Sequence, residues 1–441
     1  MTSVFHRRTG STPPRAVRAE GLSIFDAEGR EYLDASGGAA VSCLGHGHPA
    51  VVAAIRAQVA TLDYAHTGFF TSGPAEDLAA NLAAASGGRL PYAYFVSGGS
   101  EAMEAALKIA RQYHLERGEP SRTRIVARLQ SYHGNTLGAL STGGNLARRE
   151  PFAPLLFPVE HVEPCFAYRF RHDGESDADY GRRAADALEA AILRLGPENV
   201  AAFVAETVVG ATAGCVTAAD GYFRRIREIC DRHGVLLILD EVMCGMGRTG
   251  TTFAFDQEGI APDICIVAKG LGGGFQPIGA ALVSQKVYDA FAQGSGGLVH
   301  GHTYVGHPVA CAAALAVQET IAEDRLLDNV VAMGAYLTDR LVDRFGNSAH
   351  VGDIRGRGLF QALEFVADRA TKAPFERKRG IAAKLKAEAM ARGLIVYPMA
   401  GTIDGTHGDH VVLAPPYTVT KAQIDEIVRR LGDAVDATLS G

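Results

Sequence analysis

A lysine stands inside an apolar, β-branched stretch of the sequence, DICIVAKGLGGG, at residues 263–274. The residues before Lys269 predict a buried strand, whereas the other seven lysines of the chain lie in mixed or polar surroundings. A lysine in a dry pocket loses its proton more easily, and its neutral amine can then attack a carbonyl group. The pattern equally fits a lysine at a strand end whose ammonium group extends to water. This stretch alone leaves both interpretations open.

Small polar residues follow another predicted strand. After YAYFV comes SGGSE, residues 97–101, where a helix of about residues 100–116 begins. The backbone N–H groups of a helix N-terminus attract anions, and the helix dipole adds about 0.3–1 kcal/mol. A glycine–serine turn before a helix is common, so this segment indicates a phosphate site only together with other signals.

A carboxylate ends another apolar strand candidate. GVLLILDEV places Asp240 and Glu241 directly after a run of apolar residues, and a buried carboxylate needs a partner of opposite charge. That partner could be the protonated nitrogen of a pyridine ring, a basic side chain in an ion pair, or a metal ion. The metal is the weaker choice, because no set of His, Cys and carboxylate residues with ligand spacing accompanies the two acids.

The fourth feature is an aromatic residue, Tyr132 in SYHG, which follows the strand RIVARLQ. Its ring could stack on a flat cofactor, or it could pack against other side chains as most tyrosines do. Together the four features match one planar cofactor, pyridoxal phosphate. Its phosphate would lie at Gly99 and Ser100, and its ring against Tyr132. Its ring nitrogen would face Asp240, and its aldehyde would face Lys269.

Short apolar runs alternate with amphipathic helical stretches between residues 92 and 285. The strand candidates are YAYFV, RIVARLQ, VAAFVAETVVG, GVLLILDEV, DICIVAKG and IGAALVS, and helices are expected near 181–195 and 220–233. This alternation predicts an α/β fold with a mostly parallel sheet and helices on both faces. Ligands of such sheets bind at the carboxyl ends of the strands, where the four features lie.

The pattern changes after about residue 310, where long helices (306–322, 325–345, 377–392 and 420–438) alternate with short strands. It predicts a smaller α+β domain, which the first 70 residues join through a hairpin in GLSIFDAEGREYLDA. The expected large domain is 71–315, and the small domain is 1–70 with 316–441.

Composition narrows the class of protein. The net charge of −6, without a basic block, gives no indication of a nucleic-acid partner. The chain has no run of about 18 apolar residues and no signal-peptide pattern at its start, so no membrane span is expected. Seven cysteines without a CxxC pair fit free thiols in a reducing compartment, and we expect a cytoplasmic protein.

Further segments lie along nearly the whole chain: DAEGREYLDASGG, LGHGHP, SGGSEAMEAALKIAR, SYHGNT, LDEVMCGMGRTG, IVAKGLGGG, GHTYVGHPVACAAALA, IRGRGL and LAPPY. As a set they resemble the class III (ω) aminotransferases of pyridoxal phosphate fold type I. The resemblance implies a seven-stranded sheet in the large domain and pyridoxal 5'-phosphate as the cofactor.

The resemblance also implies roles for individual residues. Lys269 is similar to the lysine that forms a Schiff base with the cofactor, and Asp240 to the partner of the ring nitrogen. Tyr132 and Val242 would pack on opposite faces of the ring. Thr303 resembles a threonine that reaches the phosphate of the neighbouring subunit, which implies a homodimer with shared active sites. The implied cofactor-binding residues are Gly99, Ser100, Tyr132, His133, Glu206, Asp240, Val242, Lys269 and Thr303.

The sequence departs from the family at the substrate side. Met243 stands where a glutamine is frequent, and Val412 stands where members that handle α-carboxylates have an arginine two positions before APP. The entry segment GGAAVSCLGH has no tryptophan, and neither has the rest of the chain. Another cation must then bind the carboxylate, and the candidates are Arg355, Arg357 and His407.

These observations predict an enzyme that moves an amino group from an amine or ω-amino acid to a 2-oxo acid, pyruvate or 2-oxoglutarate. The alternative is a pyridoxal-phosphate-dependent decarboxylase or aminomutase of the same fold, which would share every cofactor residue. A nucleotide-binding module fits less well, because the glycines of GLGGG follow the lysine and do not open a GxGxxG helix. A non-catalytic binding protein would not need the lysine and the aspartate together.

Overall fold

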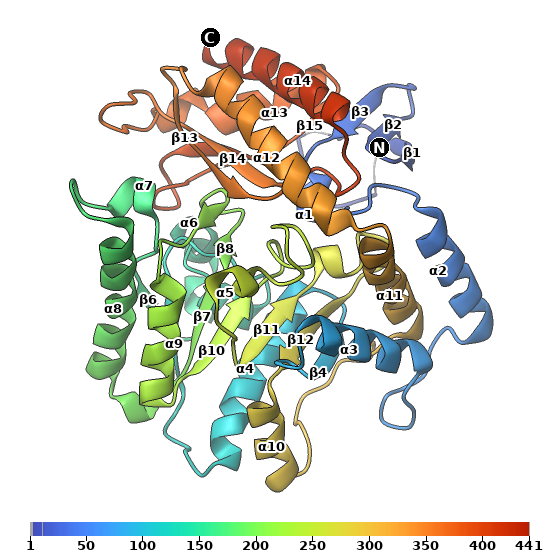
Figure 1. Ribbon diagram of the computed structural model, residues 1–441, viewed down its shortest axis with the longest axis vertical. Helices are drawn as coiled ribbons and strands as arrows, with labels where there is room; N and C mark the ends of the chain where they lie inside the picture. The colour runs from blue at the N-terminus through green and yellow to red at the C-terminus, as the bar shows by residue number, and fades with distance from the viewer. Residues whose placement is uncertain (1–2, 11, 441) are drawn as a thin grey trace.

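A computed structural model describes residues 3–10 and 12–440 of the chain. A large sheet with helices around it forms one region, and both ends of the chain form a second, smaller region beside it (Figure 1). None of the helices in the described ranges is long and apolar enough to cross a membrane.

The large sheet has seven strands in the order β4-β12-β11-β10-β7-β5-β6. They are β4 (Tyr92–Val96), β5 (Arg124–Arg128), β6 (Glu160–Val162), β7 (Val200–Glu206), β10 (Leu236–Asp240), β11 (Ile264–Val267) and β12 (Gly279–Val283). Only β12 is antiparallel to its neighbours in this sheet, so the other six strands end at the same edge. The predicted α/β fold with a mostly parallel seven-stranded sheet is confirmed. The named strand candidates contain every strand except β6, which has three residues and no apolar run.

Helices cover both faces of this sheet because its strands are apolar on both sides. In β10, Leu237 and Leu239 pack into one core with helices α3, α8, α9 and α11, while Leu236 and Ile238 pack into a second core with α4 and α10. The alternation follows the two-residue period of a strand. The bounds of these helices are α3 (Gly73–Ala85), α4 (Gly99–Glu116), α8 (Asp177–Leu195), α9 (Tyr222–His233), α10 (Gln285–Gln293) and α11 (Pro308–Glu323).

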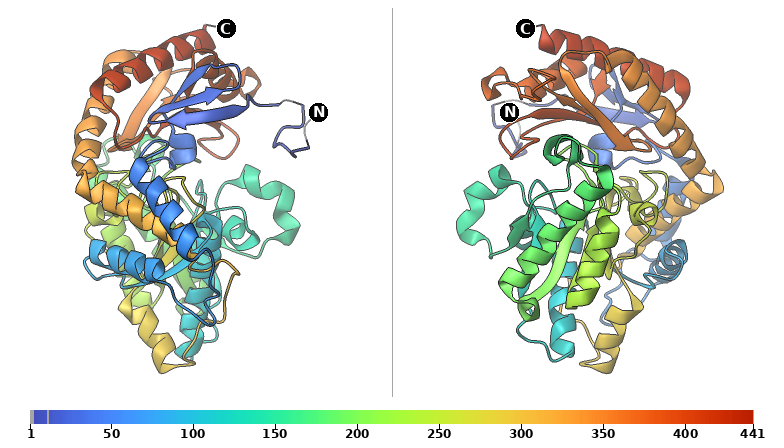
Figure 2. Two further views of the ribbon diagram at one scale, coloured as in Figure 1. Left: turned by 90° about the vertical axis from the view of Figure 1, so that its right-hand side faces the viewer. Right: turned by 60° about the vertical axis from the view of Figure 1, so that its left-hand side comes forward.

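The smaller region combines the two ends of the chain. One sheet, β1-β2-β3-β15, pairs the predicted N-terminal hairpin with a strand near residue 395, and a second sheet has the order β13-β14-β17-β16. The strands are β1 (Ala16–Glu20), β2 (Ser23–Asp26), β3 (Glu31–Asp34), β13 (Val351–Arg357), β14 (Phe360–Phe365), β15 (Leu394–Ile395), β16 (Tyr397–Ala400) and β17 (Asp409–Leu413). Figure 2 shows the N-terminal strands, in blue, against the C-terminal elements in orange and red.

Four further helices, α2 (Pro49–Thr61), α12 (Leu326–Phe345), α13 (Ile381–Ala391) and α14 (Lys421–Leu439), cover these sheets and the neighbouring α11. A third core joins N-terminal residues such as Leu44 and Val51 to C-terminal ones such as Leu431. Helix α11 contributes Ala314 to a core of the large sheet and Val317 to this third core. We propose domain boundaries at 71–315 against 1–70 and 316–441, because the chain passes from one core to the other within α11.

Short elements connect the longer ones: α1 (Gly37–Ala40), α5 (Leu137–Thr142), α6 (Leu146–Arg149), α7 (Ala167–Phe170), β8 (Val208–Val209) and β9 (Val216–Thr217). A buried ion network joins the two regions. Glu364 on β14 is fully buried and pairs with Arg169 on α7 and, at 2.7 Å, with Arg355 on β13. Arg355 also donates to the carbonyl oxygen of Gly214 at 2.6 Å, so its charge is fully engaged in holding the regions together.

Candidate active site

A cavity of about 1040 Å³ lies at the carboxyl edge of the large sheet. Residues that end or follow β4, β5, β7, β10 and β11 form its floor, and residues of α13 and β16 close it from the smaller region. Eight of the nine residues predicted to bind the cofactor line it: Gly99, Ser100, Tyr132, His133, Glu206, Asp240, Val242 and Lys269. The strands therefore bring together groups that lie up to 170 residues apart, from Gly99 to Lys269.

Lys269 lies two residues after the end of β11, in the cavity wall, and its backbone has the left-handed φ of 45°. Burial lowers the pKa of its amine to about 8, although the negative charges of Asp240 and Glu206 act in the opposite direction. No carboxylate within the described ranges forms an ion pair with it. The amine therefore faces a shared cavity and not the outer surface, which favours the nucleophile over the solvated strand end.

Asp240 ends β10 and is almost completely buried. Its Oδ2 lies 2.7 Å from Nδ1 of His133, and its Oδ1 accepts a hydrogen bond from the backbone N–H of Val242 at 3.0 Å. An Nδ1–H that donates to the carboxylate stabilises the negative charge in this buried place. The other ring nitrogen of His133, Nε2, is buried and has no hydrogen-bond partner in the described part of the chain.

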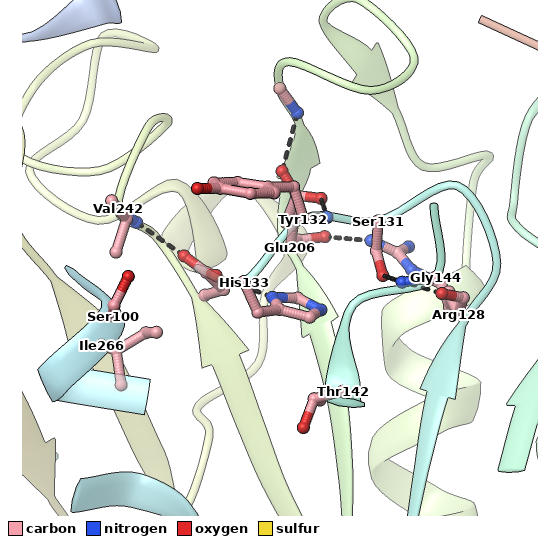
Figure 3. A network of polar contacts seen from close by, with 12 residues as sticks. Ser100, Arg128, Ser131, Tyr132, His133, Thr142, Gly144, Glu206, Val242 and Ile266 are labelled. Atoms are coloured by element: carbon pink, nitrogen blue, oxygen red, sulfur yellow. Dashed lines mark hydrogen bonds and ion pairs between the residues drawn. The ribbon is translucent and has the colours of Figure 1, made fainter. Parts of the chain in front are cut away.

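Glu206 ends β7 next to Asp240, its partner in the parallel register of β7 and β10. Its carboxylate accepts hydrogen bonds from the backbone N–H groups of Tyr132 at 3.0 Å and Gly210 at 2.8 Å. Figure 3 shows Tyr132 and His133 beside this carboxylate. Burial raises the pKa of Glu206, and the neighbouring Asp240 acts in the same direction. Glu206 thus fixes the backbone from which the Tyr132 ring enters the cavity.

A backbone-lined recess lies at the N-terminus of α4. The first N–H groups of a helix have no partner within the helix, and here they belong to Gly99, Ser100 and Glu101. The Ser100 hydroxyl oxygen accepts a hydrogen bond from Asn135 N–H at 3.0 Å. A Cβ atom at Gly134, where φ is 133°, would lie 2.5 Å from that same oxygen. Only glycine leaves this recess open, and the N–H donors at the start of a helix are suited to bind a phosphate group.

Comparison with known proteins decides the family. The chain matches the family described as aminotransferase class-III over residues 4–435. It belongs to the class III aminotransferases. It is 46% identical to an uncharacterized aminotransferase of Schizosaccharomyces pombe over 99% of this chain and 95% of that protein. It is 36% identical to adenosylmethionine-8-amino-7-oxononanoate aminotransferase of Nitratidesulfovibrio vulgaris, over 97% of this chain and 78% of that protein.

Solved structures agree with this family. A thermostable (S)-enantioselective omega-transaminase from Thermomicrobium roseum has a TM-score of 0.91 and 38% identity, covering 97% of this chain and 93% of its own. An amine transaminase from an uncultivated Pseudomonas species, in its PLP-bound form, has a TM-score of 0.93 and 35% identity, with 99% of both chains covered. The resemblance, the fold and the expectation of an aminotransferase are thereby confirmed.

The ninth predicted residue of this class III aminotransferase, Thr303, lies outside the cavity. It is exposed on the loop before α11, and its carbonyl oxygen accepts a hydrogen bond from the Tyr64 hydroxyl at 3.0 Å. Thr303 is not among the residues that line the cavity of its own chain. Its predicted contact with a neighbouring subunit is compatible with this position and stays a prediction.

None of the three candidates for binding the substrate carboxylate lines the cavity. Arg355 is engaged with Glu364, Arg357 pairs with Glu258 at 2.9 Å, and His407 pairs with Asp404. Val412 is buried in β17 and does not line the cavity either. The cavity instead contains basic side chains that the sequence analysis missed, because each lies outside the recognised motifs: Arg7, Arg8, Arg148 and Lys386.

Proposed function

We propose that this class III aminotransferase uses pyridoxal 5'-phosphate to transfer the amino group of an amine or ω-amino acid to a 2-oxo acid such as pyruvate or 2-oxoglutarate. One observation carries the proposal: Lys269, with a pKa lowered to about 8, faces the same cavity as the buried pair of Asp240 and His133. The omega-transaminase and the amine transaminase among the similar structures support the choice of donor.

The residues present fit this cofactor. The first turn of α4 and Ser100 would hold the phosphate in a recess that a Cβ at Gly134 would fill. Val242 and Tyr132 would flank the ring, and Asp240 would accept a hydrogen bond from the ring nitrogen. When bound, pyridoxal phosphate supplies a carbonyl group for the amine and a ring that withdraws electrons from the neighbouring carbon.

Side chains of the cavity, Lys269 above all, would carry out the proton transfers of the reaction. With a pKa of about 8, about a tenth of the Lys269 amine is neutral at pH 7, against fewer than about one in a thousand for an ordinary lysine. The neutral Nζ can accept a proton from the donor carbon and return it at the next stage. Contacts with His133 Nδ1 and with the Val242 N–H hold the Asp240 carboxylate in place, where it would accept a hydrogen bond from an N–H donor in the cavity.

We further propose a homodimer with shared active sites. The loop that carries Thr303 contacts a second loop, since the rings of Tyr64 and Tyr304 lie 5.9 Å apart. The exposed apolar side chains on these two loops are Phe69, Phe70, Val299 and Tyr304. Large apolar groups gathered on a surface are typical of a protein interface. A second copy of the chain would cover them and bring Thr303 to the partner's phosphate.

A panel of amines, ω-amino acids and α-amino acids, each with pyruvate and with 2-oxoglutarate, tests the proposed function. The expected result is a new amino acid and a new carbonyl compound in equal amounts, with a change in cofactor absorbance. Carbon dioxide, or an isomer formed without a second substrate, would instead indicate the decarboxylase or aminomutase. Lys269→Ala is the matched control, because it removes the amine and leaves the cavity otherwise intact.

A further inference from the structure

The cavity has more positive charge than its cofactor residues explain. Its lining includes five basic residues and two acidic ones, Glu206 and Asp240. Both acids are engaged, because each already accepts hydrogen bonds from neighbouring groups. Of these five basic residues, only Lys269 closely follows a strand of the large sheet. The other four lie on segments away from the strand ends, and an anion is the ligand that such a set attracts.

Arg148 differs from the other three because its position is defined by packing. Its guanidinium carbon lies 4.6 Å from the centre of the Tyr132 ring, a distance at which the cation and the ring attract each other. The side chain is half-buried, and no carboxylate in the described residues pairs with it. Arg7, Arg8 and Lys386 are all exposed.

The segment before Arg148 is tied to the floor of the cavity. The backbone N–H of Arg148 donates to the side chain of Asn145 at 3.2 Å, which caps α6. Gly144 donates to the hydroxyl oxygen of Ser131 at 3.0 Å and accepts from Gln130 N–H at 3.1 Å, so α6 is anchored to the loop after β5. This is the same loop that carries Tyr132. The arginine and the ring it covers therefore have a fixed relation to each other.

We propose that Arg148 binds the substrate carboxylate, in place of the arginine that members handling α-carboxylates commonly have where this chain has Val412. The inference rests on the proposed function and assigns the substrate class: a donor whose carboxylate is remote from the reacting amine, and a 2-oxo acid acceptor. Arginine can hold a carboxylate with two parallel N–H···O bonds, and the Tyr132 face keeps the guanidinium plane oriented. The N-terminus of α4 and the recess at Gly134 provide a separate place for the cofactor's phosphate.

The test compares Arg148→Gln with Arg357→Gln, which removes an arginine that pairs with Glu258 outside the cavity. The first readout is equilibrium binding of 2-oxoglutarate to each holoenzyme, measured by titration calorimetry. The second is kcat/KM for 4-aminobutyrate and for butylamine, which has the same chain length without the carboxylate. The third is the dissociation constant of pyridoxal phosphate from each apoenzyme.

For Arg148→Gln we expect 2-oxoglutarate binding and kcat/KM for 4-aminobutyrate to fall about 10- to 100-fold. The kcat/KM for butylamine and the cofactor affinity should change less than threefold, and Arg148→Lys should restore part of the loss. Arg357→Gln should match the wild-type enzyme in all three measurements. Equal losses for 4-aminobutyrate and butylamine, or a loss of cofactor affinity alone, would overturn the assignment. If the unchanged enzyme transaminates no amine, the proposed function fails, whereas calorimetry still decides whether Arg148 binds the 2-oxo acid.

Discussion

The floor and the mouth of the cavity are built in different ways. At the floor, Asp240 and Glu206 end strands of the large sheet and Lys269 closely follows one, and hydrogen bonds hold both carboxylates in place. At the mouth, Arg148 lies on the four-residue helix α6, and Arg7, Arg8 and Lys386 are exposed. A sheet edge fixes side chains more firmly than short helices and terminal segments do. The comparison indicates that the floor sets the chemistry for all substrates, while the mouth sets the choice among them.

Removing the Lys269 amine is expected to have the largest effect. Lys269→Ala should lower turnover at least about 10³-fold, or about 4 kcal/mol, for every donor, because the nucleophile and the proton carrier are lost together. The fold should survive, since only a small void is left. Steady-state rates and circular dichroism measure the two outcomes. Near-normal turnover in the purified variant would end the proposed role.

Changing Asp240 to asparagine should have the next largest effect. Asp240→Asn keeps the shape but removes the charge that stabilises a protonated ring nitrogen, so the rate should fall about 10²-fold or more. Cofactor binding should persist through the recess at Gly99 and Ser100. Turnover and cofactor absorbance, recorded on the same sample, separate the two effects. An unchanged rate would mean that the ring nitrogen has another partner.

The proposed dimer contact should affect cofactor retention and not chemistry. Thr303→Val should weaken pyridoxal phosphate binding about tenfold, whereas Thr303→Ser, which keeps the hydroxyl, should not. Dilution that separates the subunits should release cofactor in parallel, as gel filtration with absorbance detection would show. Monomers that keep their full cofactor absorbance would contradict a shared site.

The preference among amino donors tests whether the mouth of the cavity, and not its floor, selects the substrate. Because Val412 cannot bind a carboxylate, we expect primary amines and ω-amino acids to be used at least as well as α-amino acids of similar length. The values of kcat/KM for one donor of each kind measure this. A preference of more than about tenfold for the α-amino acid, or about 1.4 kcal/mol, would show that an α-carboxylate is held firmly near the floor.

The smallest effect concerns pH. In the cofactor-free enzyme, the Lys269 amine should become reactive as pH rises through about 8, since burial lowers its pKa from the ordinary lysine range. Reductive methylation with peptide mass spectrometry would measure this, with the exposed Lys384 as the internal comparison. The same burial disfavours the ammonium form in the folded state, so this contribution to stability should improve between about pH 8 and 10.5. A midpoint for Lys269 near that of Lys384 would contradict a dry environment.

Much of the floor could be predicted from the sequence, because a charged residue at the end of an apolar strand stands out and parallel strands end together. The pairing of His133 with Asp240 could not, since 107 residues separate them and no periodicity links them. The strand β6 was missed because its three residues carry no strand pattern. Arg148 was missed for a related reason. Its role depends on its contact with Tyr132, and the local sequence LARRE is typical of any solvated helix.

The left-handed backbone at Lys269 has a consequence for the stability of variants that lack the lysine. A non-glycine residue at a φ of 45° costs about 1–2 kcal/mol, which glycine avoids at a smaller entropic cost in the unfolded chain. Lys269→Gly should therefore unfold at a higher denaturant concentration than Lys269→Ala, by the equivalent of about 0.5–1 kcal/mol, although both are inactive. The residue proposed to carry the catalytic amine thus lies at a position where glycine would be more stable, so the proposed activity would be maintained against the folding preference of the backbone.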